Sequence, residues 1–280
     1  MQKRNLPLAL ALIGGAVGLG LRRWQLAAGF EPDTGLPIPG APAYIALLAF
    51  SALMALALAA LLYPLKGSWS YDVAFAAREN QLYMACVTLG AFLLLGSGVM
   101  ELLDFPAAYA AAREAEANGV RLALVLPPLR ILSCLLGAGC TLFIGANGYK
   151  GLGRGKESPA GLGLCLLFCV WLVTVYQKRA IDPVTQNYLY EVLCVVFALM
   201  GMYYFTGWSF QTGKLRRSLF CFTMAVYLSL VTLADPHSLA DRLRFGFVLL
   251  FFAAHALLLL QEHPAEAADA PAETEETENG

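Results

Sequence analysis

The sequence predicts an all-α integral membrane protein, a polytopic transmembrane bundle of about eight helices arranged as four antiparallel hairpins. Hydrophobic residues make up 59% of the 280 positions and charged residues only 14%, whereas an ordinary soluble domain has roughly 25% charged residues. The long apolar runs are hydrophobic on every helix face instead of amphipathic, which is typical of helices surrounded by lipid. These observations exclude a water-soluble fold.

The spans follow from the lengths of these runs. A helix needs about 20 apolar residues to cross a hydrocarbon core of roughly 30 Å, and interfacial aromatic or snorkelling basic residues extend runs that are slightly short. The predicted spans cover residues 6–21, 43–65, 81–100, 131–146, 161–176, 188–207, 218–234 and 245–260.

The first run resembles a signal peptide, because Lys3 and Arg4 precede an apolar stretch. No small-x-small cleavage site follows, and the run ends in Arg22-Arg23-Trp24. We therefore interpret it as a retained first span. Between the third and fourth spans, the alanine-rich outer loop predicts a short surface helix.

Charge divides the chain into a transmembrane domain, residues 1–261, and an acidic tail, residues 262–280. The tail carries seven acids with no Lys or Arg, and we expect it to be disordered. The transmembrane domain contains all 19 basic residues and 13 acids. This positive balance suits anionic lipid head groups and gives no reason to invoke nucleic acid. The lipid bilayer is thus the expected partner.

The inner loops carry ten basic residues and the outer loops nine, and most acids of the transmembrane domain lie in the outer loops. This asymmetry predicts that both termini are cytoplasmic.

No metal or cofactor is expected. All seven cysteines lie in apolar runs, and Cys165 and Cys169 share a helix face without a nearby His or carboxylate, so packing is the simpler interpretation. The glycine-rich inner loop is not a phosphate-binding loop, because Gly155-Lys156 is followed by Glu157. We find no catalytic motif.

Several charged residues lie in the outer half of the predicted bundle, where burial is costly without a partner. This candidate outer polar cluster comprises Arg22, Arg23, Glu101, Asp104, Arg130, Asp182 and Glu191. A structural ion-pair network and a ligand-binding site are both consistent with it, and snorkelling alone also accounts for the two N-terminal arginines. We expect one of those arginines to pair with Glu191 first, and with Glu101 or Asp104 next.

His255 is the deepest titratable residue in the predicted spans. A hydrogen bond to a neighbouring helix and a role in proton transfer are the two interpretations. Gly14 and Gly18, four residues apart, favour close helix contact and also match a weak dimerisation motif.

Two stretches carry a resemblance to a known group of proteins. The segment from Leu21-Arg22-Arg23-Trp24-Gln25 to Pro37, and the segment from Ala225-Val226-Tyr227 to Asp235, resemble small multi-pass proteins of anaerobic Gram-positive bacteria. The resemblance implies a bacterial plasma membrane and no particular activity or site residue.

Two functional hypotheses remain open at this stage. The first is a non-catalytic regulatory or scaffolding membrane protein, which would contact a membrane-protein partner or a second copy of the chain. The second is a small-solute transporter or channel that uses the outer polar cluster. The first is favoured because transporters usually carry interrupted helices or midplane charges, whereas these charges lie near the outer end. An intramembrane enzyme ranks third.

Overall fold

The computed structural model describes residues 3–31, 34, 36–67, 69–117, 123–151, 158–180, 182–210 and 212–261. All its regular elements in these ranges are helices, and the predicted tail, 262–280, lies outside them. The elements are η1 (Lys3–Asn5), α1 (Leu6–Ala28), α2 (Pro42–Leu62), α3 (Tyr71–Ala74), α4 (Gln81–Leu103), α5 (Phe105–Ala117), α6 (Leu126–Lys150), α7 (Ser158–Arg179), η2 (Thr185–Asn187), α8 (Leu189–Ser209), α9 (Leu215–Thr232) and α10 (Leu239–Leu260).

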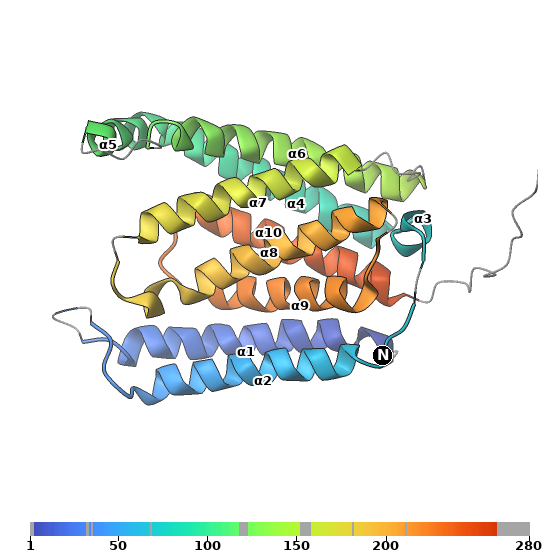
Figure 1. Cartoon of the computed structure of the whole chain (residues 1–280), viewed down its shortest axis with the longest axis horizontal. Helices are drawn as coiled ribbons and strands as arrows, with labels where there is room; N and C mark the ends of the chain where they lie inside the picture. The colour runs from blue at the N-terminus through green and yellow to red at the C-terminus, as the bar shows by residue number, and fades with distance from the viewer. Residues whose placement is uncertain are drawn as a thin grey trace, which may run out of the picture.

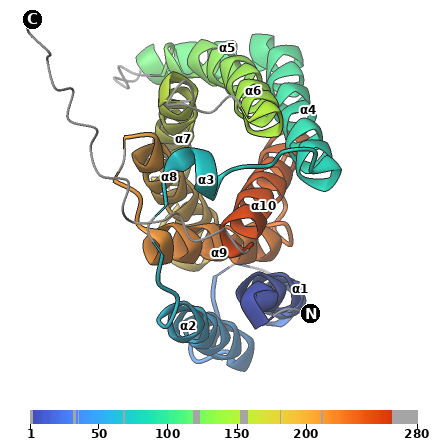
Figure 2. The same ribbon diagram turned by 90° about the vertical axis from the view of Figure 1, so that its right-hand side faces the viewer.

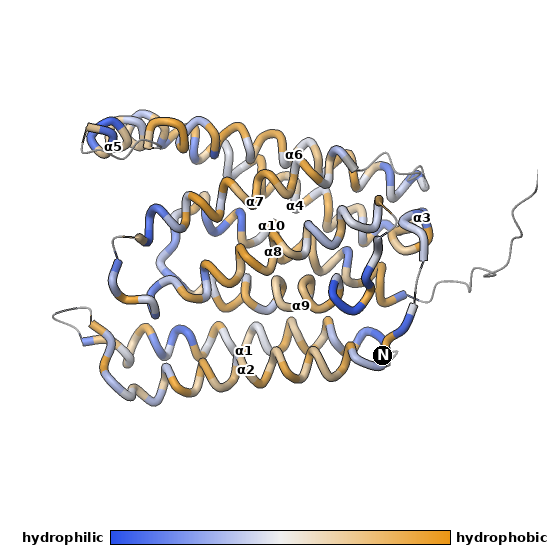
Figure 3. The backbone as a smooth tube through the Cα atoms, viewed as in Figure 1, coloured by the Kyte–Doolittle hydropathy of each residue, from blue (hydrophilic) through white to orange (hydrophobic). Residues whose placement is uncertain are grey.

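The predicted fold class is confirmed. In the described ranges, eight helices are long and apolar enough to cross a membrane. They form four antiparallel hairpins, α1/α2, α4/α6, α7/α8 and α9/α10, whose members pack against each other (Figure 1). Hydrophilic segments gather at the two ends of the bundle (Figure 3), which we call the inner end, where α1 begins, and the outer end, where α1 finishes. The surface helix predicted in the outer loop is α5.

Six of the spanning helices form a closed ring in which α4, α6, α7, α8, α9 and α10 each pack on the next. Figure 2 shows this ring end-on, with α1 and α2 outside it. Helix α1 packs on α9, and α2 packs on α1 and α9. Helices α9 and α10 are therefore the most buried spans, whereas α2 is the least buried.

Aromatic side chains fill the ring along its length. Trp171 and Phe245 pack at 5.0 Å between ring centroids, and Phe168 and Phe247 at 6.2 Å, so α7 contacts α10 across the ring. Towards the inner end, Phe205 of α8 lies 5.9 Å from Phe251 of α10. The interior is thus a packed core.

The inner loop between α2 and α4 closes the ring in a way that the sequence did not predict. Helix α3 lies across the inner opening (Figure 2), and Phe75 follows it with only 3% of its surface exposed. Its ring lies 4.9 Å from that of Phe205 and 5.8 Å from that of Trp208, and Ala77 donates its N–H to the carbonyl of Gly148 at 3.3 Å. The loop is thereby part of the core.

Close contact between α1 and its neighbours depends on glycine. A Cβ atom on Gly18 would lie 2.7 Å from a methyl group of Val231 on α9, and a Cβ on Gly14 would overlap Met54 on α2. The expectation of close helix contact at these glycines is confirmed, and the contact lies within one chain.

Several helices are longer than the sequence predicted. Helix α1 continues to Ala28, α10 begins at Leu239, and α6 begins at Leu126. The first two extensions carry charged residues that find partners inside the bundle, as described below. The third contains Pro127 and Pro128, which a first helical turn tolerates because its N–H groups have no partner within the helix.

Candidate functional site

Arg22 is the centre of a buried polar group near the outer end of α1. Its side chain is fully buried, and its Nε donates to Oδ1 of Asp235 at 2.7 Å. One Nη group donates to Oε1 of Gln25 at 2.8 Å and to the carbonyl of Gln186 at 3.0 Å, and the other donates to the carbonyl of Asn187 at 3.1 Å. The guanidinium thus joins α1 to the loops before α8 and after α9.

The expected pairing of Arg22 with Glu191 was wrong. Glu191, only 1% exposed, accepts hydrogen bonds from Nε and Nη2 of Arg179 at 2.9 and 2.7 Å. Arg23, one position further along α1, is exposed, and so is Asp104. Arg179 thus takes the carboxylate of Glu191, and Arg22 pairs with Asp235 instead.

A second polar group joins α4, α6 and α10. Oε1 of Glu101 accepts hydrogen bonds from both Arg130 and Arg244. Arg244 also donates to Oδ1 of Asp241 at 2.9 Å, and Lys178 of α7 lies 3.6 Å from Oδ2 of the same carboxylate. Each buried carboxylate of this group therefore has at least one cationic partner.

Asp182 stabilises the turn between α7 and α8. Its carboxylate accepts hydrogen bonds from the backbone N–H of Val184 at 2.8 Å and from the side-chain amide of Asn187 at 3.0 Å. These hydrogen bonds hold the pKa of Asp182 below its ordinary value, and the one from Asn187 has the largest effect. This residue thus has a turn-forming role beside the two ion-paired groups.

His237 and Asp235 lie next to each other in the loop between α9 and α10, outside the spans. Burial lowers the pKa of His237 below 6.5, and burial raises the pKa of Asp235 although Arg22 opposes that effect. The imidazole Nε2 lies 3.8 Å from Oδ2 of Asp235, and within the described ranges neither ring nitrogen has a hydrogen-bond partner. Burial thus disfavours the charged form of His237 although a carboxylate lies nearby.

The cluster encloses little space. A cavity of about 20 Å³ lies between α6, α7, α8 and α10, lined in part by Arg130, Trp171, Glu191 and Arg244. The guanidinium of Arg244 lies 5.3 Å from the centre of the Trp171 ring. Since one water needs about 10–15 Å³ measured in this way, the cavity has room for about one water molecule.

His255 is fully buried near the inner end of α10, away from this cluster. Its Nε2 lies 3.2 Å from the hydroxyl of Tyr83 on α4, and its Nδ1 lies 2.7 Å from the carbonyl of Phe251. With Nδ1 protonated and donating to that carbonyl, Nε2 accepts from the tyrosine. The hydrogen bond to a neighbouring helix is confirmed, and the proton-transfer interpretation stays untested.

Sequence reasoning missed seven residues that the structure places in the two polar groups: Gln25, Lys178, Arg179, Asp235, His237, Asp241 and Arg244. One signal was available for the last two. Ser238-Leu239-Ala240-Asp241 matches a helix-capping motif, and the structure shows Ser238 Oγ accepting from the N–H of Asp241 at 3.2 Å. A helix that begins there places Asp241 and Arg244 on one face, three residues apart.

The described residues show no metal site, and the two cysteines Cys165 and Cys169 do not form one. Among the described residues, no three His, Cys, Asp or Glu side chains are grouped to hold a metal ion. Cys165 lies 3.7 Å from Oγ1 of Thr206 on the next helix, whereas Cys169 is exposed.

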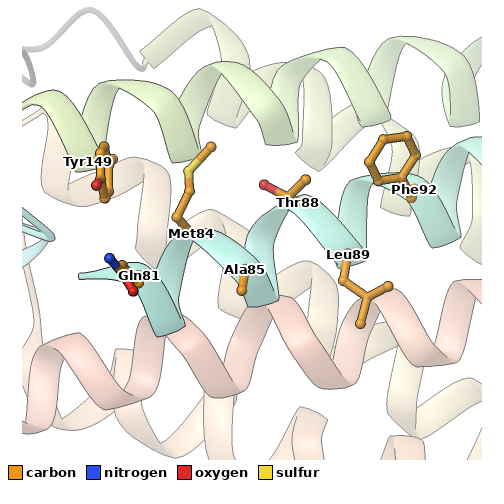
Figure 4. Close-up of a pocket in the computed structure, with 7 residues that line it drawn as sticks. All are labelled: Gln81, Met84, Ala85, Thr88, Leu89, Phe92 and Tyr149. Carbon is orange, nitrogen blue, oxygen red and sulfur yellow. The ribbon is translucent and has the colours of Figure 1, made fainter. Parts of the chain in front are cut away.

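An open groove of about 470 Å³ between α4 and the end of α6 is lined mainly by apolar side chains such as Met84 and Phe92 (Figure 4). None of its lining residues is charged. The groove therefore offers a lipid-facing surface without a charged group to hold a head group.

The chain is thus a multi-pass membrane protein in which the buried acids Glu101, Glu191, Asp235 and Asp241 of the outer end form ion pairs. Comparison with protein-family models, with curated proteins and with solved structures gives no match for this chain.

Proposed function

We propose that this chain is a non-catalytic regulatory or scaffolding protein of a bacterial plasma membrane, which acts by contact with another membrane protein or with a second copy of itself. The single observation that carries the proposal is the mutual pairing of the outer charges. Arg22 is paired with Asp235, Arg179 with Glu191, and Glu101 with two arginines. Charges used in this way stabilise helix packing and leave neither an unpaired arginine nor an unpaired carboxylate among them for a solute.

Two further features support this choice over a small-solute transporter or channel. The cavity within the cluster has room for about one water molecule, and aromatic pairs such as Trp171–Phe245 and Phe205–Phe251 fill the ring below it. A solute path would require these side chains to separate. The helices of the ring also lack the unwound midplane segments on which many transporters depend, as far as the described spans go.

A flux assay separates the two functions. We expect purified protein in liposomes to transport chloride and small carboxylates no faster than liposomes without protein. A protein-dependent flux that Arg179→Gln or Glu191→Gln abolishes would overturn the proposal in favour of the transporter.

Cross-linking tests the contact itself. Leu56 of α2 is 69% exposed, whereas Leu47 on the same helix is fully buried. A photo-crosslinker at position 56 should give one discrete adduct in membranes, of a partner or of twice the chain mass, and the same group at position 47 should give none. Adducts that are absent or heterogeneous at position 56 would contradict a specific contact on this face.

We also propose that both termini are cytoplasmic, because the inner loops carry more basic and fewer acidic residues. In a variant without native cysteines, Thr34→Cys should react with an impermeant maleimide in intact cells. Lys150→Cys, at the other end of the bundle, should react only after permeabilisation. The reverse labelling pattern would invert the topology.

A further inference from the structure

An apolar groove lies between α2 and α8 at the inner end of the bundle. Both helices pack on α9 and leave a space of about 440 Å³ between them. Leu62 and Tyr63 line it from the α2 side, Phe197 and Met200 from α8, and Phe220 from α9. These side chains form a surface suited to a hydrocarbon chain.

A basic pocket adjoins this groove. It has a volume of about 420 Å³ and lies between the segment after α2 and the start of α9, where Lys66, Lys214, Arg216 and Arg217 line it. Arg216 and Arg217 line the apolar groove as well, so the two spaces meet at these side chains. Neither space has an Asp or Glu among its lining residues.

Arg216 is held in place by groups that leave part of its guanidinium available. Its Nε donates to the carbonyl of Leu65 at 2.7 Å, and its guanidinium lies 5.2 Å from the centre of the Tyr63 ring. Within the described ranges, no acid forms an ion pair with any of the four basic residues. Among the described residues, the positive charge of this pocket is therefore not compensated by an ion pair.

We propose that these two spaces form one binding site for an anionic phospholipid, with an acyl chain in the groove and the phosphate among the four basic side chains. Charge complementarity and the join between the spaces carry the proposal. A free phosphate ion would fill only the basic pocket and would leave the groove unused. A lipid from the inner leaflet matches both spaces, and basic residues at this depth attract anionic lipids.

The charge requirement is tested on the full chain, stripped of lipid in a non-ionic detergent. Native mass spectrometry should show that dioleoyl phosphatidylglycerol binds at least about tenfold more tightly than dioleoyl phosphatidylcholine, because only the former carries net negative charge. The double variant Lys214→Gln/Arg217→Gln keeps the hydrogen bond from Arg216 and should reduce that preference about tenfold or more. The control Arg78→Gln/Lys150→Gln removes two exposed charges from the same end outside the site and should not.

The acyl-chain requirement is tested by filling the groove. Ala59 lines it, whereas Ala60 is exposed beside it and does not. Ala59→Trp should weaken phosphatidylglycerol binding about tenfold, judged from the several kcal/mol that acyl burial contributes, and Ala60→Trp should leave it unchanged. Both variants keep all four basic residues, so a loss of phosphatidylglycerol binding with Ala59→Trp alone would place the acyl chain in the groove.

Several results would overturn the proposal. Equal affinity for the two lipids, or equal effects of the two double variants, would remove the role of charge. If glycerol 3-phosphate or inorganic phosphate stabilises the protein as much as the lipid, the site binds phosphate alone. If deletion of residues 262–280 lowers stability while the lipid has no effect, the acidic tail is the occupant. A dimer that Ala59→Trp dissociates would assign the groove to a second copy.

Discussion

Arg22 and Asp235 form a buried ion pair between residues 213 positions apart in the sequence, with 2.7 Å between Nε and Oδ1. The pair joins α1, which lies outside the ring, to the loop between α9 and α10, which are two helices of the ring. Because both side chains are almost completely shielded from solvent, neither charge can regain hydration if its partner is removed.

Loss of either partner should therefore destabilise the protein. We expect Arg22→Ala and Asp235→Ala each to lower the free energy of unfolding by about 3 kcal/mol, and the double variant to cost no more than the worse single one. Arg23→Ala is the control, because Arg23 is exposed and should change stability by less than about 0.5 kcal/mol. Denaturant titration in mixed micelles measures all four values, and additive single effects would contradict the pair.

The sequence predicts the fold of this protein better than it predicts the ion pairs of the outer polar cluster. The eight spans were predictable because the bilayer requires long apolar runs. Their ends were not, since Arg22 and Arg244 ended the apolar runs although both side chains find partners inside the bundle. The pairing of Arg22 with Asp235 instead of Glu191 was not predictable either, because hydropathy does not report which side chains meet.

Glu101 should be the most sensitive acid of the outer polar cluster. It accepts hydrogen bonds from Arg130 and Arg244. Glu101→Gln therefore leaves Arg130 without an ion-pair partner among the described residues and leaves Arg244 with Asp241 alone. We expect a loss of about 3 kcal/mol in the free energy of unfolding. Asp104→Asn, three positions later at an exposed site, should change it by less than about 0.5 kcal/mol. Similar losses for both variants would show that the ion pairs of Glu101 do not stabilise the bundle.

His237 should make the protein less stable in mild acid. Its folded pKa is depressed by burial below 6.5, so the unfolded chain binds the proton more readily and stability falls as pH drops below that value. The nearby acids Glu191, Asp235 and Asp241 oppose the depression, while Arg179 adds to it.

The melting temperature in detergent should therefore fall between about pH 7.5 and pH 5.5, and fall less for His237→Asn, which cannot titrate. The raised pKa of Asp235 acts in the opposite direction. The comparison of wild type with His237→Asn at each pH separates the contribution of the imidazole from that of Asp235. Equal pH dependence in the two proteins would mean that His237 keeps its ordinary pKa.

The acidic tail should be dispensable for folding. Residues 262–280 contain seven acids, prolines at positions 264 and 271, and no large apolar side chain, and from this composition we expect no contribution to the packed core. Truncation after Gln261 leaves α10 complete. We expect unchanged membrane yield and melting temperature, whereas a clear loss of either would indicate that the tail docks on the basic inner loops.

The hydrogen bond between Tyr83 and His255 should stabilise the contact between α4 and α10. Tyr83→Phe keeps the aromatic ring, whose centroid lies 5.4 Å from that of His255, and removes the hydroxyl that faces Nε2 at 3.2 Å. The imidazole nitrogen then stays buried without that donor, which should cost about 1–2 kcal/mol. The control Tyr149→Phe removes a hydroxyl from a half-buried residue of the neighbouring helix α6 and should have a smaller effect.

A double-mutant cycle with His255→Phe gives a sharper test of this hydrogen bond. His255→Phe leaves no ring nitrogen to satisfy, so Tyr83→Phe in that background should cost less than it does in the wild-type protein. The difference between the two costs is the coupling energy of the pair. A coupling near zero in the denaturant titration would show that the hydroxyl of Tyr83 does not hold His255 in place. The hydrogen bond to the carbonyl of Phe251 and the packing of Phe75, Phe205 and Phe251 around the imidazole would then be sufficient.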